Sequence, residues 1–467
     1  MKTPPNNTPR MFVLEDGRNV FVTFVLVTSL FVLWGFCNGM IDVMDKHFQT
    51  ELNLSKAQSA WVQFAHYLGY FFMALPAGWL ATRLGYKGGI IAGLLMVGLG
   101  GFWFLPATQI SDMASAGEVP KTIAFIAFLF GVCVIASGLT FLETIANPYS
   151  TVLGAERYAA TRINLAQSLN GIGWLTGPIV GSMYFYAKDA DGNGLGSQTL
   201  YIPYVAIGCL ALLMAAMFAF ARMPDIKSTD EYRLDDPDDA SASRSIWSHG
   251  HFVGAVIAQF FYVAAQAGIF AFFINYMTAE VPPIPASWQE RLTSLAAGGP
   301  GFISKWLEGW FETTSSGVLA FSDKGAANLA SLGFVFFLLG RLIGASILKR
   351  QPAHAVLGVY GVLSAVACVV IVLKFGWASA AGVFLCYFLM SIMFPTIFAM
   401  GIAGLGSRAK RASAYIVMAI MGGAVVPKIM GTIADHYDMS RAFLVPLVCF
   451  VVVAAYGFLW PKLSSSN

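Results

Sequence analysis

Charged residues are scarce in this 467-residue chain, because Asp, Glu, Lys and Arg make up 11% of it and hydrophobic residues make up 57%. This composition excludes an ordinary soluble enzyme and is typical of a membrane protein. The net charge of +3 reflects a bias among the loops, described below. We therefore expect no nucleic-acid partner.

Catalytic and metal-binding motifs are also missing. The sequence contains no G-x-x-x-x-G-K-[ST] loop for nucleotide phosphates, no H-E-x-x-H, and no G-x-S-x-G in a strand-turn-helix context. The six cysteines fall within apolar runs without a C-x-x-C pair, so they indicate small packing residues and neither disulfides nor a metal site. We expect no enzymatic activity, no ATP-driven transport and no cofactor.

Long hydrophobic runs dominate what is present. A membrane-spanning helix needs roughly 20 apolar residues. No Ala-x-Ala-like cleavage site follows the first run, so we expect the N-terminus to be retained. The pattern predicts an all-α membrane protein with twelve transmembrane helices, near 20–44, 56–81, 88–108, 121–150, 160–186, 200–222, 252–277, 326–349, 354–374, 378–404, 409–435 and 441–462.

The loops predict orientation and domain organisation. Placing both termini and the even-numbered loops on one side collects 17 of the 28 Lys and Arg residues there, which predicts cytoplasmic termini. The longest polar stretch on that side divides the spans six and six, as in transporters built from two halves. The expected parts are an N-terminal tail (1–19), a six-helix bundle (20–222), a cytoplasmic linker (223–251), a second six-helix bundle (252–462) and a C-terminal tail (463–467).

An unusually long external loop, 280–324, follows the seventh span. Its apolar residues at 303, 306, 307, 310 and 311 have helical spacing and predict a short amphipathic helix at the membrane surface. A partner-binding or lid element is the alternative.

Two carboxylic acids lie within apolar runs: Asp42, expected near the outer end of the first span, and Glu143 in the fourth. Ionisable groups in hydrocarbon are costly and usually serve ion or substrate movement. Loss of water favours the protonated form of a carboxyl group, so a buried acid can load a proton on one side and release it on the other. We expect Asp42 and Glu143 to couple proton movement to transport.

Amides and phenols accompany these acids. Asn38 shares a helix face with Asp42, four residues away. Such groups bind hydroxyls, and aromatic faces pack on sugar rings, although an amide in a membrane helix can also simply bond to a neighbouring helix. Lys428 can contact substrate, pair with an acid or extend to the interface, whereas Arg162 and Arg341 are expected to anchor loops. The further candidates for binding a neutral sugar are Asn164, Gln167, Gln259, Tyr262, Gln266 and Asn275.

Long motifs in a consistent order carry a family resemblance: Phe31–Asn38 with Asp42, Leu142–Pro148, Arg162–Gln167, Ala258–Gln266, Met390–Phe398 and Ile416–Gly423. They resemble the fucose/proton symporter family of the major facilitator superfamily, through essentially all twelve spans. The resemblance implies the major facilitator fold and import of a neutral monosaccharide with protons, by alternating access. It also implies that Asp42 and Glu143 couple protonation to sugar movement, that Asn164 contacts sugar, and that the same cavity is lined by Gln167, Gln259, Tyr262 and Gln266.

Four features depart from the fucose-transporter pattern. That pattern has a second amide where Gly39 stands and an aromatic hydroxyl where Phe394 stands, and Lys428 and the long loop 280–324 depart from it as well. Related branches carry glucose, galactose or N-acetylglucosamine, some with sodium. A sodium-coupled carrier is therefore an alternative, and a sugar-sensing receptor is a further one. A passive channel is disfavoured because no filter-like segment is present. We expect a monomer in the bacterial inner membrane, with sugar and lipid as its partners.

Overall fold

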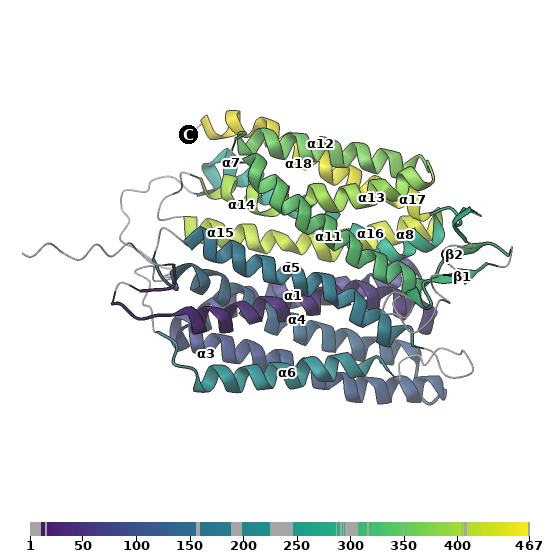
Figure 1. The fold of residues 1–467 in the computed structure, drawn as a ribbon, viewed down its shortest axis with the longest axis horizontal. Helices are drawn as coiled ribbons and strands as arrows, with labels where there is room; N and C mark the ends of the chain where they lie inside the picture. Colours follow the sequence, from purple (N-terminus) through teal and green to yellow (C-terminus); the bar gives the residue numbers. More distant parts are fainter. Residues whose placement is uncertain are drawn as a thin grey trace, which may run out of the picture.

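The long helices run side by side, and the N-terminal half of the chain lies next to the C-terminal half (Figure 1). This architecture comes from a computed structural model. It describes residues 11–465 except residue 15, the segments 156–158, 188–198, 225–245, 295–306, 315–316 and 406–408, and positions 286, 290, 291, 293, 349 and 404.

The N-terminal half consists of α1 (Phe21–Glu51), α2 (Lys56–Ser59), α3 (Trp61–Ser115), α4 (Lys121–Val152), α5 (Ala159–Phe185) and α6 (Tyr201–Phe220). α3 contains two of the predicted spans. They meet at Gly85, whose φ of 68° breaks the helix. Glycine adopts such a positive φ readily and other residues do not. α1 continues seven residues beyond the predicted end of the first span, so Asp42 lies well inside the helix and the expectation that it lies near the end was wrong.

The C-terminal half begins with the short η3 (Ile246–Ser248) after the linker. Its spans are interrupted more often than those of the first half, because four of them divide into shorter helices. The membrane helices are α7 (Gly250–Ala271) with α8 (Phe273–Ala279), α11 (Asp323–Leu348), α12 (Ala353–Val372), α13 (Trp377–Met390) with α14 (Met393–Ile402), α15 (Ala409–Met418) with η5 (Ala419–Met421) and α16 (Gly422–His436), and α17 (Met439–Ala442) with α18 (Leu444–Ser465).

Ten helical segments among the described residues are long and apolar enough to cross a membrane. The first part of α3 and α5 complete the twelve predicted spans. Both are poorer in apolar residues because they carry amides, a histidine and glycines on the faces that meet other helices. The prediction of an all-α fold with twelve spans in two six-helix bundles is confirmed.

The two ends of the bundle differ. Strands β1 (Phe311–Thr313) and β2 (Leu319–Phe321) form an antiparallel hairpin at one end, and we call this the hairpin end (Figure 1). The other end, where α1 begins and α18 finishes, is the linker end. The predicted amphipathic helix in the loop 280–324 was partly wrong. Residues 303–306 lie outside the described residues and residue 307 is helical, but residues 308–310 form a turn and Phe311 begins β1. Gly309, with φ 76°, ends the helical turn, and the Phe311 and Phe321 rings then pair across the strands at 5.5 Å.

Close packing of α1 on α5 depends on two pairs of glycines, each with the spacing G-x-x-x-G. A Cβ atom at Gly35 would lie 2.1 Å from the carbonyl oxygen of Asn170, and one at Gly173 would lie 2.3 Å from that of Val32. Gly39 packs in the same way against the backbone of Trp174. Small residues at this spacing let two membrane helices approach until their backbones touch. The helix that carries Asp42 is therefore held firmly against α5.

The two halves are joined by polar contacts at the hairpin end. Asp435 of α16 accepts hydrogen bonds from the backbone amides of Lys56 (2.9 Å) and Ala57 (2.8 Å) at the start of α2. Nearby, the Lys46 ammonium lies 3.5 Å from the Asp323 carboxylate at the start of α11. These contacts hold α16 and α11 of the second half against the first half.

We predict that Gly173→Ala destabilises the protein and that Gly171→Ala does not. The new methyl group at Gly173 meets backbone atoms that cannot rotate away, which costs about 1–3 kcal/mol. At Gly171 the nearest atom is Leu338 Cδ1, at an ordinary contact distance of 3.5 Å. Thermal unfolding in detergent, followed by size-exclusion chromatography with fluorescence detection, should give a lower midpoint for Gly173→Ala only. Equal midpoints would contradict the close-packing argument.

Candidate functional site

Polar side chains follow one face of α1 from the middle of the bundle to the hairpin end. Their spacing of three or four residues keeps them on one side of the helix. A matching polar face on α2 and the first part of α3 lies opposite. We call these eight residues the polar ladder: Trp34, Asn38, Asp42, Asp45 and Gln49 on α1, and Ser59, Gln63 and Tyr70 on α2 and α3.

Hydrogen bonds across the polar ladder fix the predicted acid Asp42. The amide of Gln63 donates to its Oδ1 atom at 2.8 Å, and its Oδ2 atom has no hydrogen-bond partner among the described residues. Two turns towards the linker end, the indole of Trp34 donates to the hydroxyl of Tyr70 at 2.7 Å. The predicted residue Asn38 lies on α1 between Trp34 and Asp42, and its side chain approaches the Tyr70 hydroxyl. Asp42 is thus buried against a neutral donor.

Glu143, the second predicted acid, lies on α4 and is half-buried. The side-chain amide of Asn147 donates to the backbone carbonyl of Glu143 at 3.0 Å and accepts from the amide of Gln167 at 3.0 Å. Gln167, predicted to bind sugar, therefore links α5 to α4 one turn away from Glu143. In this structure the NH2 group of the Gln167 side chain already donates to Asn147.

Tyr67 of α3 connects the two acids with the second half. Its phenol interacts electrostatically with Asp42, Glu143 and Tyr262. Its ring packs on Gly423 of α16, where an added Cβ atom would lie 2.4 Å from the ring. Tyr67 is thus at the boundary between the halves and close to both acids, which is where a substrate-binding site in a transporter of two halves is expected.

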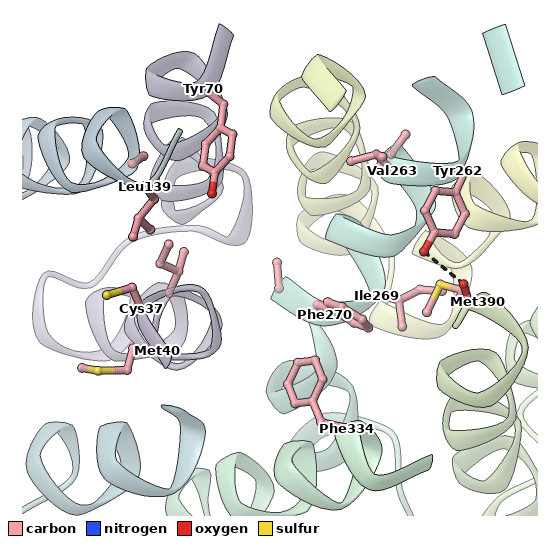
Figure 2. Packing of buried hydrophobic residues seen from close by; sticks show 14 of the residues in the cluster. Cys37, Met40, Tyr70, Leu139, Tyr262, Val263, Ile269, Phe270, Phe334 and Met390 are labelled. Carbon is pink, nitrogen blue, oxygen red and sulfur yellow. Dashed lines mark hydrogen bonds between the residues drawn. The ribbon is translucent and has the colours of Figure 1, made fainter. Parts of the chain in front are cut away.

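The second half contributes a wall of amides and phenols. Gln259 is fully buried on α7, and neither end of its amide has a hydrogen-bond partner among the described residues. Tyr262, one turn on, donates to the Met390 carbonyl at 3.0 Å (Figure 2). Tyr387 of α13 is also fully buried and interacts electrostatically with Asp42 across the boundary. Figure 2 places Tyr262 and Met390 in the second half and Tyr70 in the first.

The half-buried Gln266 lies one further turn along α7, on the same helix face as Gln259 and Tyr262. With both of them it forms an amide–phenol–amide row. Such a row offers paired donors and acceptors to a ligand that carries several hydroxyl groups.

Two arginines that were expected to anchor loops have different surroundings. Arg162 donates to backbone carbonyls at the linker end, including those of Met11 and Ala155 at 2.9 Å, as a loop anchor would. Arg341 instead lies inside α11, where it donates to the Ser391 carbonyl at 3.4 Å and covers the Phe337 ring at 5.2 Å. It therefore holds the break between α13 and α14. For Arg341 the loop-anchor prediction was wrong.

Three of the predicted sugar-binding residues lie apart from this group or outside the description. Asn275, on α8, bonds to Gln49 of the polar ladder near the hairpin end. Lys428, half-buried on α16, places its ammonium 3.4 Å from the centre of the Trp61 ring. Asn164 belongs to α5, but its side chain is outside the described part of the chain. No group of three His, Cys, Asp or Glu side chains that could hold a metal ion occurs among the described residues.

Sequence reasoning missed the partners of the acids: Gln63, Tyr67, Tyr70 and Tyr387. The first three recur at i, i+4 and i+7, which is the spacing of one helix face. That spacing, together with the low hydropathy of the second span, was a usable signal. A search for charged residues alone does not find the uncharged residues that contact the acids.

Comparison with known proteins agrees with this architecture. Residues 20–418 match the family model of the Major Facilitator Superfamily. The chain is 30% identical to the L-fucose-proton symporter of Escherichia coli (strain K12), over 95% of this chain and 94% of that one. It is 28% identical to a glucose/galactose transporter of Brucella abortus, over 98% of both chains.

Among solved structures, the chain is similar to the transporter FucP in the outward conformation, with 30% identity, a TM-score of 0.63, and coverage of 95% of this chain and 99% of that one. The D-xylose-proton symporter matches with the same TM-score at 14% identity, a likeness of fold alone. The chain is a multi-pass membrane transporter and not an enzyme; it belongs to the Major Facilitator Superfamily, in the family that includes the L-fucose-proton symporter.

Proposed function

We propose that this protein imports a neutral monosaccharide together with protons. The observation that carries this proposal is the placement of Asp42 and Glu143 around Tyr67, where the two halves meet. Neither acid forms an ion pair with a described Lys, Arg or His. A carboxyl group without a fixed cation can exist in both charge states, which a proton carrier requires. The names of the fucose and glucose/galactose relatives support the same substrate class.

The wall of α7 supports an uncharged, hydroxyl-rich substrate. Gln259, Tyr262 and Gln266 offer amide and phenol groups, and the nearby rings of Tyr67 and Phe394 offer apolar faces for a sugar ring. We extend the proposed binding set to Tyr67 and Tyr387. The other members keep their predicted role as sugar contacts: Asn38, Asn164, Gln167, Asn275 and Lys428.

For orientation, we propose that the linker end faces the cytoplasm of a bacterium and that the hairpin end faces outward, because the tails and even-numbered loops that the sequence assigns to one side carry 17 of the 28 Lys and Arg residues. The contacts of Asp435 and Lys46 then close the outer end in this structure. Transport follows when these contacts break and the cytoplasmic contacts form instead. We propose that a single chain carries out this cycle.

Reconstitution tests the proposed function. Vesicles containing the purified protein, without sodium and without a gradient, receive fucose, glucose, galactose or N-acetylglucosamine in turn. We expect at least one sugar to make the outside medium more alkaline, because each sugar that enters takes a proton with it. Protein-free vesicles are the control. Sugar uptake that requires sodium and causes no pH change would contradict proton coupling and favour the sodium-coupled alternative.

The acids have a separate test. We predict that Glu143→Gln and Asp42→Asn lower gradient-driven sugar accumulation by about tenfold or more, while sugar exchange at equilibrium stays within about twofold. The amide resembles the protonated acid in shape but cannot release a proton, so only the coupled steps fail. Accumulation and exchange are measured with radiolabelled sugar in the same vesicles. Full accumulation by either variant would remove that residue from the coupling mechanism.

Closure of the outer end is tested by a matched pair of acids on neighbouring turns. Asp435→Asn weakens the hydrogen bonds to α2, whereas the partners of Asp438 among the described residues lie in its own half, at the Arg441 amide (2.7 Å) and the Lys374 ammonium (3.2 Å). A partly exposed charged hydrogen bond contributes about 1 kcal/mol, so we expect about fivefold more of the open form.

The measurement is the rate at which a membrane-impermeant thiol reagent labels Thr278→Cys, a position that lines the pocket beside these contacts. Asp435→Asn should speed this labelling in intact cells, and Asp438→Asn should leave it unchanged. Equal rates in the two variants would contradict the role of Asp435 in closure.

A further inference from the structure

Another acid of α1, Asp45, is buried in the bundle and has no part in the mechanism described so far. Its side chain is 0% exposed, compared with 7% for Asp42. The two acids are three residues apart on one face, where side chains are neighbours with Cβ atoms about 5–6 Å apart. Their carboxyl groups interact electrostatically. Because a buried acid is costly, its position one turn from Asp42 requires an explanation.

The groups around Asp45 neither neutralise it fully nor satisfy all of its hydrogen bonds. On α1, the Gln49 amide donates to its Oδ1 atom at 3.3 Å, and on α2 the Ser59 hydroxyl approaches it. Lys46 interacts with Asp45, but its ammonium lies 3.5 Å from Asp323 of α11. Tyr186, the residue after α5, also interacts electrostatically with Asp45. The Oδ2 atom has no hydrogen-bond partner among the described residues.

A pocket of about 330 Å³ opens at the hairpin end, beside Asp45. Gln49, which donates to Asp45, is part of its wall. Lys46, Asn275 and Asp435 line it as well, so it lies where the two halves meet. Asp45 is therefore one hydrogen bond away from the pocket and one helical turn away from Asp42.

We propose that Asp45 is a further proton carrier, which passes protons between this pocket and Asp42. A hydronium ion in the pocket gives a proton to the Asp45 carboxylate and becomes a water molecule. The same proton then moves to the Asp42 carboxylate, which restores the negative charge of Asp45. This inference rests on the proposed function, because it requires that transport is coupled to protons.

A purely structural role is the alternative, in which Asp45 only accepts the hydrogen bond from Gln49. Asp45→Asn separates the two roles, because asparagine still has an oxygen that can accept this bond but cannot carry a proton. Asp45→Glu keeps the proton-carrying group. Asp112→Asn serves as the matched control, because Asp112 is an exposed acid of the same half, near the hairpin end of α3.

The experiment measures the initial rate of sugar uptake driven by an inward proton gradient, over a range of external pH, and sugar exchange without a gradient. For Asp45→Asn we expect driven uptake to fall by about tenfold while exchange stays within about twofold of the wild type. The pH optimum should shift to more acidic values, because direct protonation of Asp42 then needs more protons. Asp45→Glu should restore much of the rate, and Asp112→Asn should behave like the wild type.

Two outcomes would overturn the proton carrier. Uptake and a pH profile like those of the wild type in Asp45→Asn would assign Asp45 a structural role. Loss of exchange together with driven uptake, in a variant that is still folded in detergent, would place Asp45 in sugar binding or closure instead. A wild type that takes up sugar without moving protons would overturn the proposed function itself, and this result is recognised before any variant is compared.

Discussion

The burial of carboxyl groups among apolar helices is the constraint on which the rest of this structure depends. Asp42 is held by the neutral amide of Gln63 and not by a cation. Two cations of the second half are engaged elsewhere, Lys428 on the Trp61 ring and Arg341 at the Ser391 carbonyl. An ion pair would favour the charged acid, whereas a neutral donor leaves both charge states accessible. The site is thus suited to repeated binding and release of a proton.

Such an arrangement works only if the helices that carry the acids keep their positions. The contact between α1 and α5 provides this, because Gly35 and Gly173 bring the two backbones together without side chains between them. On another side of α1, the hydrogen bonds of the polar ladder connect α1 to α3, so α1 is held by two neighbouring helices. Lipid cannot solvate these polar groups, and the bonds between helices take the place of water.

The sequence was sufficient to predict the twelve spans, because hydropathy over about 20 residues reflects the thickness of the membrane. It was also sufficient to find Asp42 and Glu143, since an acid in an apolar run is conspicuous. Gln63 and Tyr67 were missed because uncharged polar residues are common in membrane helices, and only the fold shows which of them meet an acid. Asp45 was missed for a different reason. The hydropathy of α1 falls after residue 44, and burial of the following turns depends on helices far away in the sequence.

The position of α16 joins proton access to closure of the hairpin end. One face of this helix packs on the first half at Gly423, which contacts Tyr67, at Gly431, which contacts the backbone of Lys56, and at Asp435, which caps α2. The same helix therefore reaches from the boundary near both acids to the pocket beside Asp45. If α16 separates from α2 and α3, the Tyr67 ring and the pocket lose their cover in one movement. Proton entry from the hairpin end and opening of that end are then parts of a single structural change, which is the condition for coupling an ion to a substrate in alternating access.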